Sequence, residues 1–278
     1  SVALQLLNAS QKYTLLAIPF FILASTFMST GGVAKRIIRF SVATMGHLRG
    51  GLAISSVFAC MLFAALSGSS PATVVAIGGI AIAAMRQVGY TKDFAAGVIA
   101  NAGTLGILIP PSIVMVVYAA ATDVSVGRMF LGGVIPGLMA GIMLMTVIYI
   151  YARIKNMPRR EFAGAQEILE SAASASWGLL LIIIILGGIY SGVFTPTEAA
   201  AVAAVYAFLI ATLIYRDMGP LKNVPWKTDV ESYSQAALRN LSTIITKFPV
   251  IFFHSETRGV LVAGAKTTIM LMFIIVNA

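Results

Sequence analysis

The chain has 278 residues, of which 59% are hydrophobic and only 10% are charged. Soluble domains carry roughly 25% charged residues, so this composition excludes an ordinary soluble domain and indicates an all-α polytopic membrane protein. The formal net charge of +9 does not indicate a nucleic-acid partner, because the basic residues cluster between apolar spans, as the positive-inside rule describes. The lipid bilayer is therefore the expected surrounding.

The single cysteine, Cys60, excludes a disulfide framework or a cysteine-based metal site within the chain. The chain begins with Ser1 rather than Met and stops directly after the apolar run Ile269–Val276. We therefore expect a fragment, or a numbering that begins inside a longer protein.

The first apolar span is expected at 13–30, and a basic segment at 31–50 follows it. In this segment Lys35, Arg36 and Arg39 alternate with apolar residues. The pattern predicts an amphipathic helix along the membrane interface; the alternative is a basic cytoplasmic loop with some helix. Residues 1–50 are interpreted as a scaffold helix and an amphipathic interfacial arm.

The next segment has two apolar arms, Gly51–Leu66 and Ala72–Met85, which flank the polar run Ser-Gly-Ser-Ser-Pro at 67–71. Each arm is shorter than the roughly 20 residues that a full crossing requires. The pattern predicts a re-entrant hairpin that turns inside the membrane; the alternative is two ordinary spans joined by an exposed turn. Irregular backbone at membrane depth must be buried or line a cavity, and such breaks bind substrates and ions in secondary transporters.

The polar run itself offers two kinds of ligand. Serine hydroxyls and free carbonyls suit hard cations, and free N–H groups at the start of the second arm suit a carboxylate. Pro71 fits the first turn of that arm, where its missing N–H costs nothing. The alternative is simple helix capping without a ligand.

A second break is predicted inside the apolar span 94–121. Pro110 and Pro111 cannot continue the helical hydrogen-bond ladder and free the carbonyls around Gly106–Ile109. This stretch is either part of a mixed site of hydroxyls and carbonyls or a proline kink that serves packing alone. Residues 51–121 are interpreted as a transport-domain hairpin followed by a Pro-Pro broken helix.

Further apolar spans are expected at 129–152, 176–191, 197–215 and 259–276. The run Thr195-Pro196-Thr197-Glu198 has the pattern of a capping box; either Glu198 only closes a helix end, or this break contributes carbonyls and Thr195 to an ion site. The basic loops 153–174 and 216–242 are placed on the cytoplasmic side, from which the hairpin would enter and leave. Residues 122–227 are interpreted as further transmembrane helices with this break, and 228–278 as an atypical tail with a final apolar span.

These segments together resemble the large membrane permease subunit of tripartite ATP-independent periplasmic (TRAP) transporters. The resemblance covers about residues 10–215, and SGSSPAT followed by GTLGILIPPS is a strong signal. The other matching stretches are FFILASTFMSTGGVAKRI, GYTKDFAAGVIANAG and SGVFTPTEAAAVAAVYA. The tail from about 228 matches weakly, and only its KTTIMLMFII is family-like.

The resemblance implies a sodium-driven elevator transporter, in which a mobile domain with two re-entrant hairpins carries substrate past a scaffold. Its substrates would be organic acid anions, such as C4-dicarboxylates or sialic-acid-like carboxylates. A periplasmic substrate-binding protein would deliver them, and a small membrane subunit would support the scaffold. Such a protein is a multi-pass protein of the bacterial inner membrane, is not an enzyme, and needs Na⁺ as its coupling ion with no other cofactor.

The resemblance also assigns residues by position. The expected first sodium site comprises Ser67 and Ser69 at the hairpin tip, with the carbonyls of Gly106, Ile109 and Pro111. Gly192 and Thr195 would join a second sodium site. The anionic substrate would lie near Ser70 and Thr73.

The chain departs from the family pattern after residue 215, where no second Pro-Pro break follows. The second inverted repeat is therefore expected to be incomplete, with half of the substrate site missing. Alternatives are another hairpin-type anion transporter or channel, and a degenerate permease fragment that does not transport. An intramembrane serine hydrolase using Ser67 or Ser69 is disfavoured, because neither His47 nor His254 lies in a convincing span to act as the base.

Overall fold

Helices provide the regular structure of the computed structural model, which describes residues 13–222, 224–226 and 233–277. This part of the chain contains no strand, so the predicted all-α class is confirmed. Residues 1–12 of the expected scaffold segment and 228–232 of the expected tail lie outside the described residues. Five helices are long and apolar enough to cross a membrane, or up to six if one bent pair is counted as a single span.

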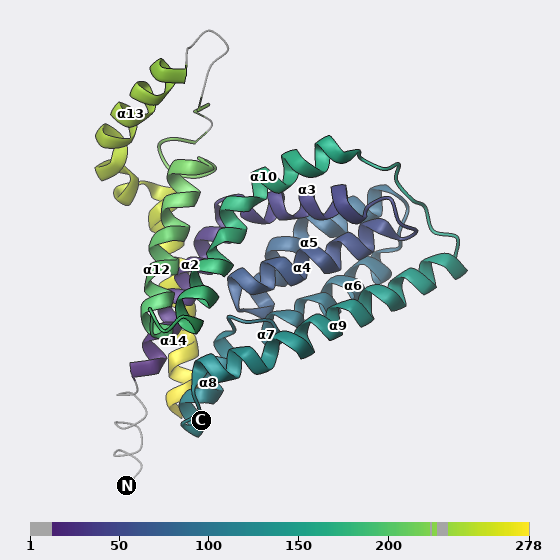
Figure 1. Cartoon of the computed structure of the whole chain (residues 1–278), viewed down its shortest axis with the longest axis horizontal. Coiled ribbons are helices and arrows are strands. Elements are labelled where there is room, and N and C mark those ends of the chain that lie inside the picture. The colour runs from purple at the N-terminus through teal and green to yellow at the C-terminus, as the bar shows by residue number, and fades with distance from the viewer. Residues whose placement is uncertain (1–12, 223, 227–232, 278) are drawn as a thin grey trace.

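The elements follow one another as shown in Figure 1. In chain order they are η1 (Tyr13–Leu16), α2 (Ala17–Thr30), α3 (Val33–Met45), α4 (Gly51–Ser67), α5 (Ser70–Gln87), α6 (Lys92–Gly103), α7 (Leu105–Leu108), α8 (Ile113–Thr122), α9 (Val126–Ile154), α10 (Ala165–Ile182), η2 (Ile183–Gly187), α11 (Gly188–Tyr190), α12 (Pro196–Leu209), η3 (Ile210–Ile214), α13 (Tyr233–Phe253) and α14 (Ser255–Asn277). The segments η2 and η3 are π-helical turns, each of which continues directly from an α-helix.

Helix α4 is the centre of the larger helix group in Figure 1. It contacts α2, α3, α5, α6, α7, α9 and α10, and 15 of its 17 residues are buried. Its partner α5 buries only one stripe, spaced by four residues, which contains Thr73, Ile77, Ala81 and Met85. This spacing is one face of a helix, so α5 packs on α4 and α6 and exposes its opposite face.

A second group is formed by α2, α12 and α14, which lie side by side at the left of Figure 1. Alanines cover the buried face of α12, and Phe27 meets Phe208 edge-on with ring centroids 5.4 Å apart. Gly31 lies so close to Ala211 that an added Cβ would clash with it. Small residues allow this close approach, as they do in membrane helix pairs generally.

Within the segment 31–50, Val33–Met45 form an amphipathic helix, α3, as predicted, and its position along the membrane interface stays a prediction. It buries Val33 and Ile37 and exposes Lys35 and Arg39. It runs antiparallel to α10, because Val33 packs on Gly178 while Arg39 reaches Glu167 near the start of α10. The α3 helix therefore lies between the hairpin and α10.

Several predicted boundaries differ from the structure. The predicted loop 216–242 contains the start of the 21-residue amphipathic helix α13 at Tyr233, and the span predicted at 176–191 begins earlier, at Ala165. The predicted spans 129–152 and 259–276 extend by a few residues to Val126–Ile154 and Ser255–Asn277. Pro136 lies inside α9 without ending it, which membrane helices tolerate better than soluble ones.

Candidate ion and substrate site at the hairpin tip

The polar run between α4 and α5 forms a tight turn. Gly68 has φ +59°, and Ser69 is extended with φ −136° and ψ 123°. The positive φ favours glycine, and Pro71 lies in the first turn of α5 as predicted. The chain therefore reverses over two residues and leaves the polar groups of Ser67 and Ser69 at the tip.

Hydroxyl and carbonyl oxygens gather inside this turn. The Ser67 Oγ lies 2.9 Å from the Thr73 Oγ1, and the Thr73 hydroxyl donates to the Ser69 carbonyl oxygen at 2.9 Å. The Ser67 hydroxyl also approaches the Ser69 carbonyl at 3.3 Å. Ser67 and Thr73 are 1% and 0% exposed, whereas Ser69 is half-buried, so the two hydroxyls of the cluster are shielded from the surface of the chain.

The Pro-Pro break lies directly against the turn. The Ile113 N–H donates to the Gly68 carbonyl at 3.0 Å, and a Cβ added at Gly68 would lie 2.5 Å from the Pro111 carbonyl oxygen. A Cβ added at Gly106 would lie 2.9 Å from the Ser69 carbonyl carbon. Only glycines allow this approach, so the structure brings Gly106 and Pro111 of the predicted site against Gly68 and Ser69 of the tip.

The break also leaves carbonyls without their helical donors. Pro110 is four residues after Gly106 and has no N–H, so the Gly106 carbonyl loses its usual helical partner. The donor four residues after Ile109 is the Ile113 N–H, which is used by Gly68 instead. These carbonyls come from buried residues, and buried carbonyls require another partner.

The tip ends part-way along the neighbouring span α9. Gly50, just before α4, contacts Ala152, and Met61 contacts Gly141, so α4 runs antiparallel to α9. Six further residues bring the tip level with about residue 135, roughly 14 Å short of the start of α9 at 1.5 Å per residue. Beyond the tip, α9 packs against Met115 of α8. This geometry agrees with the predicted hairpin that turns inside the membrane and disagrees with two full spans.

The chemistry of the tip fits a small monovalent cation. Its donors are neutral hydroxyl and carbonyl oxygens, which hard cations prefer, and no carboxylate belongs to the cluster. The described residues contain no group of three His, Cys, Asp or Glu side chains that could hold a metal ion. The residues that could hold Na⁺ are therefore Ser67, Ser69, Thr73 and the carbonyls of the break.

The predicted second sodium site has a different local structure. Gly192 and Thr195 are exposed, and Thr195 accepts from the Glu198 N–H while Glu198 accepts from the Thr195 N–H at 2.8 Å. The predicted capping box is confirmed. Among the described residues, no hydrogen bond joins this segment to the hairpin tip.

The predicted substrate residues separate from each other. Ser70 is partly exposed at the start of α5, whereas Thr73 is completely buried with its hydroxyl in the oxygen cluster. Sequence reasoning placed Thr73 with the substrate and did not link it to Ser67. The available signal was the spacing, since Ser69 and Thr73 are four residues apart across the first turn of α5.

Sequence reasoning also did not single out Ser112. It is fully buried, and its hydroxyl accepts from the Met115 N–H at 3.5 Å at the start of α8. A serine directly after Pro110 and Pro111 is a recognisable N-cap signal. The bend of about 40° between α6–α7 and α8 therefore has a capped helix on its far side.

The fold and the tip define a membrane protein of the transporter class, with an oxygen-lined hairpin turn set against a broken helix. The family described as "Tripartite ATP-independent periplasmic transporter, DctM component" matches residues 1–278, and the chain belongs to this family. Its proteins are transporter permease subunits and not enzymes, so the serine hydrolase alternative is excluded. The family match also includes the tail from about residue 228, where the sequence motifs alone resemble the family only weakly.

Three relatives carry the name "C4-dicarboxylate TRAP transporter large permease protein DctM". The protein from Vibrio cholerae serotype O1 is 67% identical over 279 residues, which cover 100% of this chain and 58% of that protein. The protein from Pseudomonas aeruginosa is 56% identical over 278 residues, which cover 100% of this chain and 57% of that protein. The protein from Rhodobacter capsulatus is 45% identical over 294 residues, 100% of this chain and 67% of that protein. The chain thus spans little more than half the length of the first two relatives.

Proposed function

We propose that this chain is the ion-binding part of a permease that takes up C4-dicarboxylate anions with a sodium gradient. The observation that carries the proposal is the oxygen cluster of Ser67, Ser69 and Thr73 against the Pro-Pro break, in which the Ser67 and Thr73 hydroxyls are buried. Its donors are neutral and numerous enough for a desolvated monovalent cation. The names of the 67% and 56% identical relatives support dicarboxylates over sialic-acid-like substrates.

The proposed coupling depends on how the tip is held. The Thr73 hydroxyl donates to the Ser69 carbonyl and meets the Ser67 hydroxyl, so a bound cation would take over oxygens that now bond to each other. This exchange would tie the ends of α4 and α5 to the break at Gly106–Pro111. An anionic substrate beside Ser70, at the N-terminal end of α5, would then meet a positive charge and free N–H groups.

Further parts of the proposal concern the whole transporter. A small membrane subunit would support the scaffold, and a periplasmic substrate-binding protein would deliver the anion, in the bacterial inner membrane. Alternating access would be of the elevator type, with the hairpin moving as one unit with the broken helix. Gly192 and Thr195 would contribute to a second sodium site only if the capping bonds of Thr195 rearrange.

The deciding experiment is uptake of labelled succinate by proteoliposomes that contain the complete gene product, its small subunit and its binding protein. We expect uptake that requires both the binding protein and an inward sodium gradient. Uptake that ignores sodium would refute the assigned ion. Absence of uptake for a panel of organic acids, from well-folded protein, would favour the non-transporting alternative.

A second measurement tests the cation site in this chain alone. A ligand that binds only the folded state raises thermal stability according to its concentration and affinity. We expect Na⁺ to raise the melting temperature above that in the same concentration of K⁺. Equal stabilisation by both salts would contradict a selective site at the tip.

A further inference from the structure

A groove separate from the hairpin tip opens between α3 and the base of the hairpin. It has a volume of about 440 Å³ and is lined by residues from α3, α4, α5, the loop before α10, and α10 itself. Arg160 of that loop donates its N–H to the Gly46 carbonyl at 3.3 Å, so the loop is fixed across the end of the groove. The groove is therefore formed by segments far apart in sequence.

The floor of the groove is apolar. Residues from three helices provide it, and they are Ile38, Val42, Ala43, Leu52, Ile80 and Ala84. Ile80 is 41% exposed, and Ala84, one turn further along the same side of α5, also lines the groove. An apolar floor that is open along one helix fits an extended hydrocarbon chain.

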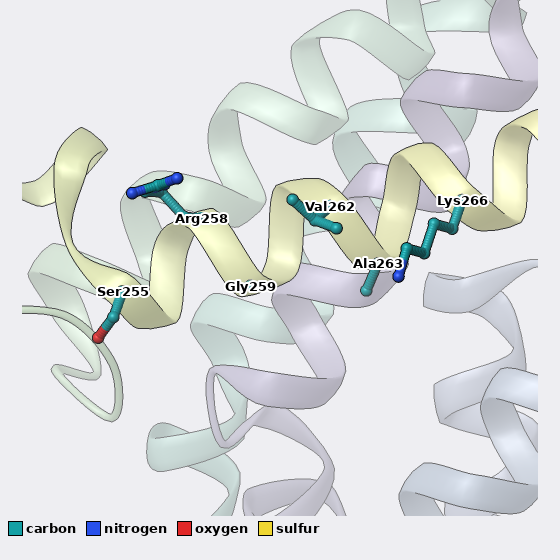
Figure 2. Close-up of a pocket in the computed structure, with 6 residues that line it drawn as sticks. All are labelled: Ser255, Arg258, Gly259, Val262, Ala263 and Lys266. Carbon is teal, nitrogen blue, oxygen red and sulfur yellow. The ribbon is translucent and has the colours of Figure 1, made fainter.

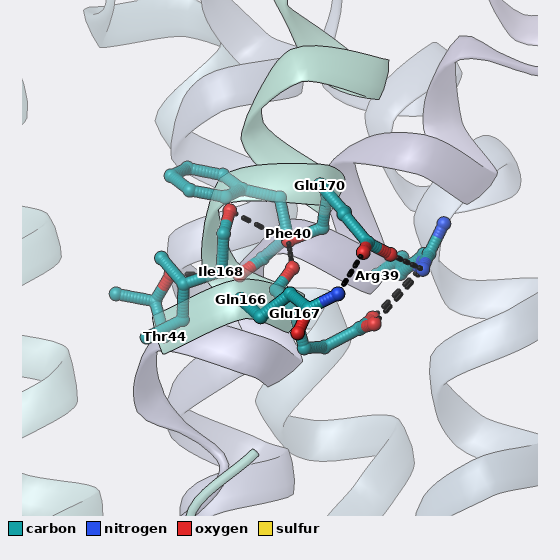
Figure 3. Close-up of polar contacts among 8 residues, drawn as sticks. Arg39, Phe40, Thr44, Gln166, Glu167, Ile168 and Glu170 are labelled. Carbon is teal, nitrogen blue, oxygen red and sulfur yellow. Dashed lines mark hydrogen bonds and ion pairs between the residues drawn. The ribbon is translucent and has the colours of Figure 1, made fainter. Parts of the chain in front are cut away.

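The rim of the groove carries charges of unequal availability. Arg39 is neutralised by a bidentate pair with Glu167, at 2.8 and 2.9 Å, and lies 3.9 Å from Glu170 (Figure 3). The contact with Glu167 also raises the pKa of Arg39. Lys35 and Arg160 are exposed, and neither side chain has an ion pair among the described residues.

The surroundings of the rim are basic. Glu161 is the remaining charged residue of the lining and is exposed. The same end of the molecule holds Arg49, whose side chain reaches Asn156 at 3.1 Å, and the loop residues Lys155 and Arg159. A basic rim above an apolar floor, beside an amphipathic helix, is the arrangement expected at a membrane interface.

We propose that this groove binds an anionic phospholipid. The phosphate would lie between the ammonium of Lys35 and the guanidinium of Arg160, and one acyl chain would cover the floor formed by Ile80 and Ala84. Charge complementarity selects the headgroup, because Arg39 is already paired whereas these two cations are not. The apolar floor requires the hydrocarbon, which a soluble phosphate lacks. The lipid would fill the space between α3 and the hairpin base.

A contrasting surface shows what the proposal requires. The open hollow on α14 has Arg258 and Lys266 on one face of a single helix (Figure 2). It has no floor from a second element, because all of its lining residues belong to α14. The groove beneath α3 differs in being enclosed by several elements.

The test uses the purified protein, stripped of lipid in detergent, with palmitoyl-oleoyl phosphatidylglycerol or phosphatidylcholine added. Native mass spectrometry counts the bound lipids and gives their apparent affinities. We expect phosphatidylglycerol to bind more tightly than phosphatidylcholine. The double variant Lys35→Gln with Arg160→Gln should bind phosphatidylglycerol at least tenfold more weakly. Each basic residue near an anionic headgroup contributes about fivefold to the affinity.

The matched control removes two charges from the same loop outside the groove, Lys155→Gln with Arg159→Gln. It should retain the tight binding of phosphatidylglycerol. Equal losses in the two double variants, or equal wild-type affinities for both lipids, would overturn the proposal. A third variant, Ala84→Phe, fills the floor of the groove and keeps the charges. It should weaken the binding of both phosphatidylglycerol and phosphatidylcholine. Displacement of phosphatidylglycerol by the same concentration of glycerol 3-phosphate would show that the floor is unused and would also overturn the proposal.

Discussion

The hydroxyl oxygens of Ser67 and Thr73 lie 2.9 Å apart across the turn of the hairpin. The two residues belong to different arms, since Ser67 ends α4 and Thr73 lies in the first turn of α5. Both side chains are buried, so the two arms share one oxygen cluster away from solvent. A buried polar contact between two arms of a turn fixes the turn and also offers ready-made ligands.

Replacing Ser67 by alanine removes one oxygen from this cluster. The proposed sodium site would lose a ligand, so Ser67→Ala should raise the sodium concentration needed for half-maximal uptake by about tenfold, which corresponds to about 1.4 kcal/mol. The measurement is succinate uptake as a function of sodium in proteoliposomes.

The matched control is Ser56→Ala on the same helix. Ser56 is also buried, but its hydroxyl donates only to the Leu52 carbonyl of its own helix at 2.7 Å. The Ser56→Ala variant should lower the free energy of unfolding by no more than about 1 kcal/mol. The sodium dependence of its uptake should be unchanged. If both variants shift the sodium dependence equally, the role assigned to Ser67 is wrong.

Gly106 offers a steric test of the contact between the break and the tip. An added Cβ would lie 2.9 Å from the Ser69 carbonyl carbon and the Ser70 nitrogen, so Gly106→Ala should displace the tip and lower the melting temperature. Gly97→Ala is the control on α6, where an added Cβ meets nothing within 4 Å. That change should stabilise the helix by roughly 0.5–1 kcal/mol. A stabilising effect of both changes, measured by thermal unfolding in detergent, would exclude a tight contact.

The main elements of this site could be predicted from the sequence because they depend on local signals. Proline at 71, 110 and 111 and the polar run at 67–70 mark breaks whatever the rest of the chain does. Thr195 and Glu198 form a capping box three residues apart, a pattern that needs no tertiary contact.

Features that depend on the third dimension were not predicted. Thr73 joins Ser67 because Gly68 adopts a positive φ and reverses the chain within two residues, and the sequence allows other turns. The π-helical turns at Ile183–Gly187 and Ile210–Ile214 lie in runs where nearly every residue is apolar. Hydrophobic periodicity carries no information there.

Thr195 has a structural role that can be separated from the predicted ion role. Its hydroxyl caps α12, so Thr195→Ala should lower stability by about 1 kcal/mol, and Thr195→Ser should restore it. Thermal unfolding measures this effect, and uptake measures the sodium dependence. If Thr195 only caps α12, Thr195→Ala should leave the sodium dependence of uptake unchanged. An increase in the sodium concentration needed for half-maximal uptake, as expected for Ser67→Ala, would instead support a second sodium site at Thr195.

Arg216 provides the last prediction, because its guanidinium is buried and forms no ion pair with a carboxylate of the described residues. It lies 4.0 Å over the Trp226 ring and donates to the Asn240 Oδ1 at 2.8 Å, and it is 3% exposed. Burial lowers the pKa of Arg216, as does repulsion from Arg239. The Asn240 amide in turn donates to the Trp226 carbonyl at 2.7 Å. This cluster therefore joins the segment after η3 to α13.

Asn240→Leu keeps the size of the side chain but removes one of the three acceptors of the Arg216 guanidinium, the other two being the carbonyls of Leu213 and Val224. We expect a loss of about 1.5–3 kcal/mol of unfolding free energy, which is the contribution of a hydrogen bond to a charged group. Thr246→Val is the control on α13, because the Thr246 hydroxyl bonds only to carbonyls of its own helix. In Arg216→Met, the additional change Asn240→Leu should cost much less than it does alone, because no buried charge remains to be satisfied. Strictly additive losses in this cycle would show that the two side chains act independently.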